Sequence, residues 1–291
     1  MRIGFIGLGM MGRPMAERLL ASGFEVRVSD SSAALAADFD AAWASTPQAA
    51  CAGADVVVTM LPNGHVVRDV LTGPGGVADV LGEGAIVLDM SSSDASGTIE
   101  LGGMLAVRGM RLIDAPVSGG VAMARQGTLA LMVGCPDDRL FEAVAPVLSA
   151  LGSRIVRVGP LGAGHAAKAI NNAIAACIFA VTSEGLVLGE RYGLDQATLL
   201  TVINGSTGRS GVSEGLFPSQ VLTGRYALGF ALALMTKDVG IANAMRREAG
   251  LDLPLIADTH AQLAEALDAL GPASDFTAFH RHTVQRNGEG R

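Results

Sequence analysis

The chain has 291 residues, of which 49% are hydrophobic and 17% charged, and its formal net charge is −7. This length suits two ordinary domains, and the hydrophobic content supports a large core. The acidic balance and the lack of a basic run argue against a nucleic-acid-binding protein. Because few charged residues are available to cover a monomer, we expect an oligomer that buries additional surface.

The N-terminal part of the sequence alternates strand and helix patterns. Residues 2–9, RIGFIGLG, form an apolar run that ends in glycine, which is typical of a buried parallel strand. Residues 14–23 follow with helical spacing and end at a glycine. Further strand patterns occupy 25–30, 54–62, 84–91, 111–118, 129–134 and 153–159, and helical patterns lie at 64–71, 94–108 and 137–150. This alternation predicts an α/β domain with a Rossmann-type doubly wound sheet over residues 1–161.

The pattern changes after residues 159–164, where no further convincing strand follows. Helical stretches are expected at 165–191, 195–204, 212–223, 229–248 and 254–269, and the tail from residue 281 is expected to fray. We therefore predict an all-helical domain over residues 162–291, joined to the first domain by a long helix.

The long helix contains an apolar stretch, 169–189, that has the length of a membrane span. Its polar residues favour a buried helix over contact with lipid: Asn171, Asn172 and Glu184. The three cysteines are widely spaced and typical of buried residues in a cytoplasmic protein: Cys51, Cys135 and Cys177. No set of metal ligands is apparent, so we expect no metal. Because the long helix is interpreted as buried, we also expect no membrane partner.

A glycine-rich loop, G-x-G-x-x-G, follows the first strand at Gly7, Gly9 and Gly12. The first glycine permits a tight turn, the second lets the backbone approach a pyrophosphate, and the third lets helix and strand pack closely. The helix that begins there offers unpaired N–H groups and partial positive charge to phosphates. We expect a dinucleotide site, with backbone contacts from the loop residues Leu8, Met10 and Met11.

Asp30 ends the second strand, where a carboxylate can accept hydrogen bonds from the adenosine ribose hydroxyls and repel a 2′-phosphate. Ser31 and Ser32 follow instead of an arginine, which favours NAD over NADP. The alternative is that Asp30 only opens a turn with Ser31.

Two later strand ends are expected to face the cofactor, because ligands of such sheets bind at the carboxyl ends of the strands. The residues concerned are Leu61, Pro62 and Ser92. The serine cluster could instead cap the following helix, and both roles are compatible if Ser93 or Asp94 provides the cap.

Four ordered motifs resemble the β-hydroxyacid dehydrogenases, the family of 3-hydroxyisobutyrate dehydrogenase and tartronate semialdehyde reductase. They are GFIGLGMMGRPMA, DAPVSGGVAMARQGTLALMVG, GAGHAAKAINN and MTKDVGIA, and the resemblance runs from Arg2 to about Phe279. It implies a Rossmann domain followed by a helical domain, often in dimers or tetramers. Within the second motif, Ala122 and Met123 depart from the usual Ser-Gly-Gly-x-Gly-Ala, and Cys135 replaces a glycine, which puts the identity of the substrate in doubt.

The resemblance also implies roles for individual residues. Lys168 would be catalytic and Asn172 would orient the substrate or the lysine. The substrate carboxylate would be held by Ser118, Gly119 and Gly120. Lys237 would contact the nicotinamide end of the cofactor, and Arg209 is a further substrate contact. Without the resemblance, Lys237 and Arg209 are ordinary surface residues, and neighbouring Lys237 and Asp238 need not pair.

The residues themselves suit alcohol oxidation, which requires a base to accept the hydroxyl proton. A lysine pKa of about 10.4 is too high for this task near neutral pH. The first turns of the long helix and the small apolar neighbours of Lys168 both disfavour its ammonium form. Backbone N–H groups at Ser118–Gly120 can bind a carboxylate. His65 and His165 have no carboxylate at a useful spacing, so neither receives a role.

We therefore expect an NAD-dependent oxidoreductase that interconverts a small 3-hydroxy carboxylate and its semialdehyde or ketone. Two alternatives remain: an NADPH-linked aldehyde or imine reductase, and a nucleotide-sensing binding module without activity. Asp30 and Lys168 count against the first, and the combined set of site residues counts against the second.

Overall fold

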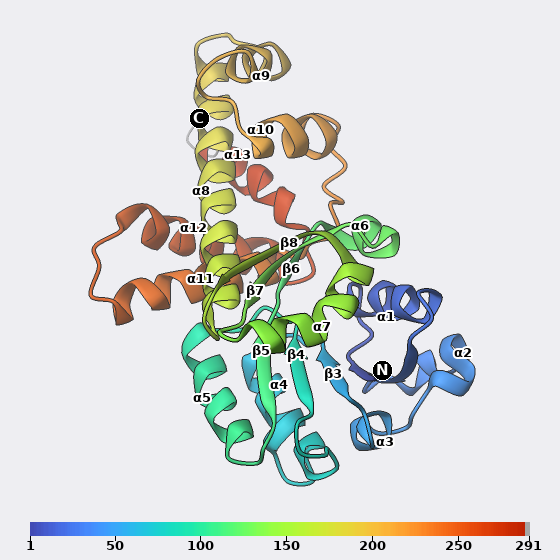
Figure 1. The fold of residues 1–291 in the computed structure, drawn as a ribbon. Helices are drawn as coiled ribbons and strands as arrows, with labels where there is room; N and C mark the ends of the chain where they lie inside the picture. The colour runs from blue at the N-terminus through green and yellow to red at the C-terminus, as the bar shows by residue number, and fades with distance from the viewer. Residues whose placement is uncertain (289–291) are drawn as a thin grey trace. The chain divides into compact units, whose positions relative to one another are not determined.

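The computed structural model describes residues 1–288, and the chain divides into two compact units, Met1–Lys168 and the remainder from Ala169 onward (Figure 1). The division falls inside helix α8 (Ala163–Arg191), which begins in the first unit and continues into the second. Each unit has its own hydrophobic core.

The first unit is built on an eight-stranded sheet with the order β2-β1-β3-β4-β5-β7-β6, in which β8 also pairs with β7. Its strands are β1 (Arg2–Ile6), β2 (Glu25–Ser29), β3 (Val56–Thr59), β4 (Ile86–Asp89), β5 (Arg111–Asp114), β6 (Val117–Ser118), β7 (Leu129–Gly134) and β8 (Gly152–Gly159). Strands β2 to β5 in this order are parallel to their neighbours, as the alternating pattern predicts. Strand β7 runs antiparallel to β5 and β6, which the sequence patterns did not indicate.

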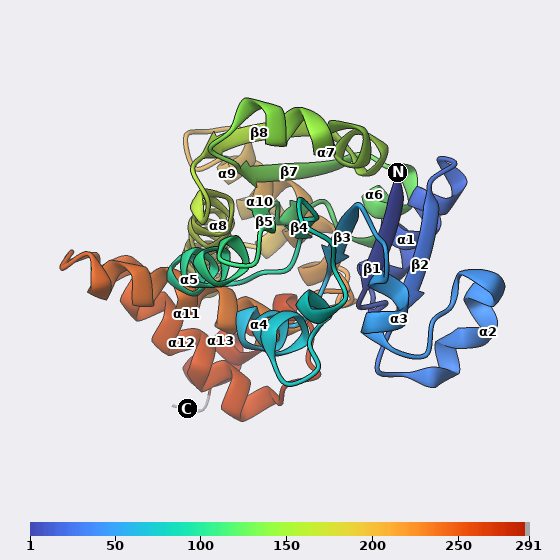
Figure 2. The same cartoon turned by 60° about the horizontal axis from the view of Figure 1, so that its bottom comes forward.

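Helices cover both faces of this sheet, which makes it doubly wound (Figure 2). One face packs against α1 (Gly12–Ala21), α6 (Gly120–Gln126) and α7 (Asp138–Leu151). The other face packs against α3 (Pro47–Cys51), α4 (Gly64–Thr72) and α5 (Ala95–Ala106). Alternate residues of one strand point to opposite faces: Phe5 lies in the first layer and Ile6 in the second. Short helical segments complete the unit: α2 (Ala36–Phe39) and the 3-10 turns η1 (Ala33–Leu35), η2 (Asp40–Ala42) and η3 (Val77–Asp79).

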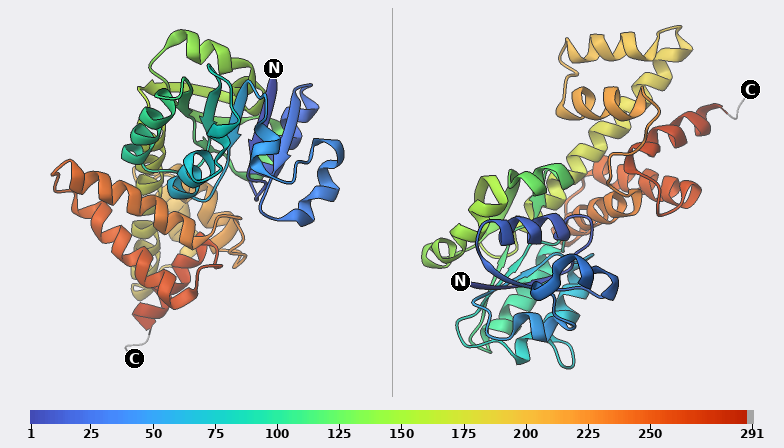
Figure 3. Two further views of the ribbon diagram at one scale, coloured as in Figure 1. Left: turned by 90° about the horizontal axis from the view of Figure 1, so that it is seen from below. Right: turned by 90° about the vertical axis from the view of Figure 1, so that its right-hand side faces the viewer.

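The second unit is helical, and Figure 3 shows its helices beside α8. They are α9 (Gln196–Asn204), α10 (Gly211–Leu216), α11 (Leu232–Glu248), α12 (Pro254–Leu270) and α13 (Phe279–Gly288), with a π turn η4 (Phe217–Val221) and a 3-10 turn η5 (Phe276–Ala278). Four buried rings mark its core: Phe179, Phe217, Phe276 and Phe279. The expectation of a frayed tail from residue 281 was wrong up to Gly288, because Phe279 and Thr283 are buried and fix α13; residues 289–291 lie outside the described part.

Helix α8 is long and apolar enough to cross a membrane, with a mean hydropathy of 1.6 over its most apolar window. Half of that window is buried inside the structure. Its buried residues include Ala173, Ala176 and Phe179, which belong to the core of the helical unit. A core helix of this kind passes the same length and hydropathy test as a membrane span.

Candidate active site

The glycine loop joins β1 to α1, and its three glycines meet different surroundings. Gly7 has a φ of +98°, and a Cβ there would collide with the carbonyl oxygen of Met60. A Cβ on Gly12 would collide with the carbonyl oxygen of Gly7, so this glycine lets the helix close onto the strand. Around a Cβ on Gly9, by contrast, no atom of the described chain lies within 4 Å. The open space at Gly9 is where the dinucleotide pattern requires room for a ligand.

The N-terminus of α1 points out of this loop. Within residues 1–288, no side chain caps the helix at Met11, and its first turn contains no acidic residue. Met10 is exposed, Met11 is half-buried and Leu8 is buried. This helix end therefore keeps its N–H groups and partial positive charge for an anion, as the sequence predicts.

Asp30 lies against the same loop. Its Oδ2 atom accepts a hydrogen bond from the backbone N–H of Leu8 at 2.6 Å. Its Oδ1 atom accepts from the N–H of Ser32 at 2.8 Å and from the Ser31 hydroxyl at 3.5 Å. The structure thus shows the turn at Asp30 and its contact with the glycine loop together, so the turn does not compete with a role in the loop.

The ends of β3 and β4 are joined by a polar network. The N–H of Leu61 donates to the Ser91 hydroxyl at 2.9 Å. Asp89, buried at the end of β4, accepts hydrogen bonds from the Thr59 hydroxyl at 2.9 Å, the Ser91 N–H at 3.0 Å and the Ser93 hydroxyl at 3.2 Å. Ser92 in this loop was predicted from the sequence and Asp89 was not, although an acid that ends a buried parallel strand is a visible signal.

Pro62 and Ser92 lie in the two loops that this network connects, Pro62 exposed and Ser92 half-buried. Asp94 caps α5 by accepting from the N–H of Gly97 at 2.6 Å. The helix cap is therefore provided by Asp94, and the contact of Ser92 with the cofactor stays a prediction.

The segment after β5 turns sharply at two glycines. Ser118 ends the short strand β6, and Gly119 and Gly120 follow with φ values of +135° and +71°. Successive backbone N–H groups in a turn can form a concavity that binds an anion. The serine is half-buried and both glycines are exposed.

The start of α8 is fixed to the carboxyl edge of the sheet. Asp114, fully buried at the end of β5, accepts hydrogen bonds from the N–H groups of Gly162 and His165, both at 2.8 Å. A Cβ on Gly164 would lie 2.8 Å from Asp114 Oδ2, so the chain must be glycine there. Lys168 follows within the first two turns, half-buried. Burial raises the pKa of Asp114, while the charge of His165 and the two N–H groups act in the opposite direction.

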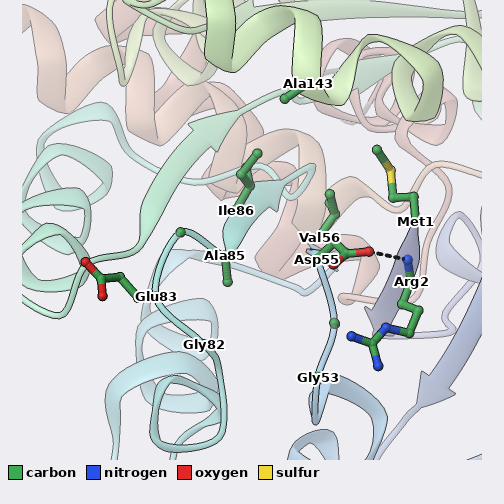
Figure 4. Close-up of a pocket in the computed structure, with 12 residues that line it drawn as sticks. Met1, Arg2, Gly53, Asp55, Val56, Gly82, Glu83, Ala85, Ile86 and Ala143 are labelled. Carbon is green, nitrogen blue, oxygen red and sulfur yellow. Dashed lines mark hydrogen bonds between the residues drawn. The ribbon is translucent and has the colours of Figure 1, made fainter.

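Three predicted elements therefore come together in the first unit: the glycine loop, the strand-end loops and the beginning of the lysine helix. The relevant strands are parallel, so their carboxyl ends share one edge. A pocket of about 410 Å³ lies at the opposite edge, where Arg2, Asp55 and Ile86 begin or precede their strands (Figure 4). Its position at the amino ends separates it from the predicted cofactor site.

In the helical unit, Asn172 and Lys237 are linked through Asp238. The Asn172 amide donates to Asp238 Oδ2 at 2.7 Å, and Lys237 Nζ lies 3.2 Å from Asp238 Oδ1. Asn172 and Asp238 are buried, and the Lys237 side chain is 27% exposed. From the sequence, Lys237 and Asp238 were expected to be neighbours that need not pair, and Asp238 was not predicted as the common partner.

Arg209 lies on the surface of the helical unit, with 64% of its side chain exposed, and pairs with Glu214 at 2.8 Å. Within residues 1–288, the ion-pair partner of Arg209 is thus Glu214, which is not one of the predicted site residues. Among the described residues, no group of three or more His, Cys, Asp or Glu side chains is placed to hold a metal ion.

Models of known protein families match both units of the chain. Residues 2–159 match the model of the NAD-binding domain of 6-phosphogluconate dehydrogenase. Residues 162–283 match the model described as the NAD-binding domain of NADP-dependent 3-hydroxyisobutyrate dehydrogenase. The chain belongs to the β-hydroxyacid dehydrogenase family. Its N-terminal domain is an NAD(P)-binding domain, and the protein is an oxidoreductase acting on the CH–OH group.

The chain is similar to two dehydrogenases and a reductase. It is 40% identical to 2-(hydroxymethyl)glutarate dehydrogenase of Eubacterium barkeri, covering 88% of this chain and 86% of the relative. It is 36% identical to 3-hydroxyisobutyrate dehydrogenase of Pseudomonas aeruginosa, covering 96% and 97%. It is 34% identical to 3-sulfolactaldehyde reductase of Escherichia coli, covering 95% and 94%.

Solved structures agree with this assignment. The 3-hydroxyisobutyrate dehydrogenase of Mycobacterium tuberculosis with L-serine has a TM-score of 0.89 at 34% identity, covering 97% of this chain and 98% of that one. The imine reductase of Streptomyces aurantiacus has a TM-score of 0.64 at 16% identity, covering 97% and 99%. At this low identity, the similarity to the imine reductase shows only that the two proteins share a fold.

Proposed function

We propose that this dehydrogenase interconverts a small 3-hydroxy carboxylate and its semialdehyde or ketone, with NAD as the cofactor and Lys168 as the general acid/base. The observation that carries this proposal is the occurrence of three features in one α/β unit. The glycine loop follows β1, and the Ser118–Gly120 turn follows β6. The start of the lysine helix is anchored by Asp114 at the end of β5. This is the set of parts that hydride transfer from a hydroxy acid requires.

The residues of the glycine loop fit a dinucleotide. The open space at Gly9 and the uncapped end of α1 would take the pyrophosphate. Leu8, Met10 and Met11 would contribute backbone contacts. When bound, the nicotinamide supplies the hydride acceptor for oxidation or the hydride donor for reduction. Loop residues Leu61, Pro62 and Ser92 would line the remainder of the cofactor site.

NAD is favoured over NADP by Asp30. Its carboxylate already anchors the glycine loop through Leu8, so it is fixed where the adenosine ribose would lie. Its negative charge would repel a 2′-phosphate. One observation favours the other cofactor: a structural relative with a TM-score of 0.84 and 27% identity, Psf3, is described in complex with NADP+. A direct comparison of the two cofactors decides between them.

The substrate carboxylate would bind in the turn at Ser118, Gly119 and Gly120. The N–H groups of these two glycines, which turn at positive φ, would form an anion-binding concavity, and the Ser118 hydroxyl would add a third donor. This arrangement favours a hydroxy acid over an uncharged alcohol. It also counts against an aldehyde or imine reductase, because an uncharged aldehyde or imine does not need a carboxylate-binding turn.

Lys168 would transfer the proton. It lies near the positive end of α8 and is half-buried, so both the helix dipole and desolvation favour its neutral amine. In oxidation the amine accepts the substrate hydroxyl proton, and in reduction the ammonium returns it. Asn172 follows one turn later in the same helix and would orient the substrate or the lysine. Its amide is held by Asp238, which also pairs with Lys237, the proposed contact at the nicotinamide end.

An activity panel tests the proposal. The substrates are 3-hydroxyisobutyrate, glycerate, threonate, serine and 3-hydroxypropionate, each measured with NAD and with NADP. We expect at least one 3-hydroxy acid to be oxidised, with a higher kcat/KM for NAD. A tenfold preference for NADP would overturn the cofactor assignment, and binding of NAD without turnover of any β-hydroxy acid would favour a nucleotide-sensing module.

We further propose a homodimer or homotetramer that works in the cytoplasm. Helix α8 carries large apolar side chains that are 46–63% exposed and recur at helical spacing: Ile170, Ile174, Val181 and Leu188. Such a stripe is typical of a helix that packs against another subunit. Light scattering of Val181→Glu tests this, because a charge within a packed stripe should reduce the mass of the particle, whereas an unchanged mass would contradict it.

A further inference from the structure

His165, at the start of the lysine helix, has no role in the site that the sequence predicts. It is 1% exposed, in the first turn of α8, three residues before Lys168. Two buried carboxylates face its ring: Asp89 Oδ2 lies 3.7 Å from Nε2, and Asp114 Oδ2 lies 3.9 Å from Nδ1. The sequence showed no carboxylate nearby because these two acids end β4 and β5, far away in the chain.

The hydrogen bonds of Thr98 determine which ring nitrogen carries a proton. The Thr98 hydroxyl lies 2.7 Å from the carbonyl oxygen of Asp94 and 2.8 Å from His165 Nδ1. A carbonyl oxygen only accepts, so the single hydroxyl hydrogen must be directed at Asp94. The Thr98 oxygen therefore accepts at the other contact, and Nδ1 of His165 is the donor.

The surroundings of Nε2 favour a second proton. This nitrogen is buried and has no hydrogen-bond partner within residues 1–288. Its nearest carboxylate, Asp89, receives three donated hydrogen bonds and donates none, as an ionised carboxylate does. A lone pair on Nε2 would face this negative charge at 3.7 Å, whereas an N–H would be attracted by it.

We propose that His165 is a positioning residue, present as an imidazolium between Asp89 and Asp114, that fixes the first turn of α8 and thereby Lys168 against the cofactor loops. The contacts form one continuous path. Asp114 holds the N–H of His165, Asp89 holds the Ser91–Ser93 loop, and Ser91 in turn holds Leu61. The imidazolium connects the two carboxylates and so joins the helix start to both loops.

The charge of this imidazolium also acts on Lys168. Residues three apart on a helix are neighbours, and the Cβ atoms of His165 and Lys168 are expected to lie about 5–6 Å apart. Asp89 from β4 and Asp114 from β5 are the titratable groups that face the ring, and Thr98 faces it from α5. Replacing the cation with a neutral side chain leaves both acids in place and favours a protonated Lys168. This consequence rests on the proposed role of Lys168, whereas the protonation of His165 does not.

The first test observes the ring itself by long-range ¹H–¹⁵N NMR of the intact protein at pH 7, with the His165→Asn variant assigning the signal. We expect both ring nitrogens to be protonated. A neutral ring nitrogen at Nε2 would overturn the proposed charge, whatever the enzyme's activity. This result is independent of the substrate and of Lys168.

The second test compares His165→Asn with Thr98→Val in the pH dependence of kcat and in NADH affinity. The asparagine amide keeps a donor for Thr98 but lacks the charge, so we expect the apparent basic pKa of kcat to rise by about one unit, with NADH affinity reduced less than threefold. Thr98→Val keeps the charge, so its profile should retain the wild-type pKa while kcat falls severalfold. A wild-type kcat and profile in His165→Asn would overturn the positioning role, even if Lys168→Ala shows the lysine to be catalytic.

Discussion

The amide nitrogen of Asn172 donates a hydrogen bond to Oδ2 of Asp238 at 2.7 Å, although 66 positions separate the two residues. The other oxygen of the same carboxylate lies 3.2 Å from Lys237 Nζ. One buried acid thus organises the two residues of the helical unit to which the family resemblance gives catalytic and cofactor-binding roles. Loss of the Asp238 carboxylate is expected to disturb the positions of both Asn172 and Lys237.

Replacing Asp238 with alanine should lower the free energy of unfolding of the helical unit by about 3 kcal/mol, because removal of one partner leaves buried polar groups without compensation. Urea unfolding measured by far-UV circular dichroism reports on the helices of both units, whereas the fluorescence of Trp43, the single tryptophan, reports on the first unit. A circular dichroism transition that shifts without the fluorescence transition therefore belongs to the helical unit. Glu265→Ala is the matched control, since its exposed pair with Arg286 should contribute less than about 1 kcal/mol. Equal effects of the two substitutions would contradict the importance of Asp238.

Alanine substitutions in the glycine loop should separate folding from ligand binding. Gly9→Ala introduces a Cβ into open space, so the melting temperature should change little. The same Cβ occupies room needed by the pyrophosphate, so we expect the NADH dissociation constant to rise at least about tenfold. Gly12→Ala should instead destabilise the protein, because its Cβ collides with backbone. Unaltered NADH binding by Gly9→Ala would place the cofactor elsewhere.

Asp30→Asn should weaken the discrimination between cofactors. The asparagine oxygen can still accept from Leu8, so the loop keeps its anchor while the charge is lost. We expect the ratio of kcat/KM for NAD to that for NADP to fall at least about tenfold, measured with one hydroxy acid. Asp38→Asn removes a nearby exposed carboxylate that pairs with Arg13 and controls for net charge. If both variants change the ratio equally, Asp30 has no specific role.

His280 should make the helical unit sensitive to mild acid. Burial lowers the pKa of this histidine, the charge of Glu190 counteracting it, and its ring packs edge-on against Phe217. Above the ordinary pKa of about 6.5 the histidine is neutral in both states. As the pH falls below this value the unfolded chain binds the proton first, so stability declines until the lower pKa of the folded state is reached.

The expected slope in that window is at most about 1.4 kcal/mol per pH unit. Urea unfolding of the wild type and His280→Gln between pH 7.5 and 5.5 measures it. The half-buried His260, whose pKa is also lowered by partial burial, is present in both proteins and cancels in the comparison. Parallel stability curves would show that His280 does not contribute.

Most of the elements were predictable because the periodicity of hydrophobic residues is a local property. The apolar runs around Phe5, Val57 and Leu88 lie in strands buried on both faces, and such runs are visible without tertiary information. The antiparallel direction of β7 was not predictable, because it depends on how the chain turns at Gly119 and Gly120. Helix α13 was missed because its stability comes from packing of Phe279 and not from a strong sequence pattern.

In the candidate site, too, local features were predictable and tertiary contacts were not. Glycine positions and strand ends follow from chain geometry, so Gly7, Gly12 and Asp30 could be placed from the sequence. The partners of His165 and Asn172 could not, since Asp114 and Asp238 approach them only after the chain has folded. The rule that adjacent helix residues point apart was also insufficient for Lys237, because its long side chain reaches Asp238.

The proton-transfer role of Lys168 is tested most directly by a single-turnover measurement of NADH formation. The variants are Lys168→Ala and Lys168→Arg, and the latter keeps a cation that does not deprotonate. We expect both to bind NADH within threefold of the wild-type affinity and to form it about 10²–10⁴-fold more slowly. Wild-type rates with the wild-type pH dependence in either variant would contradict the assignment of Lys168 as the general acid/base.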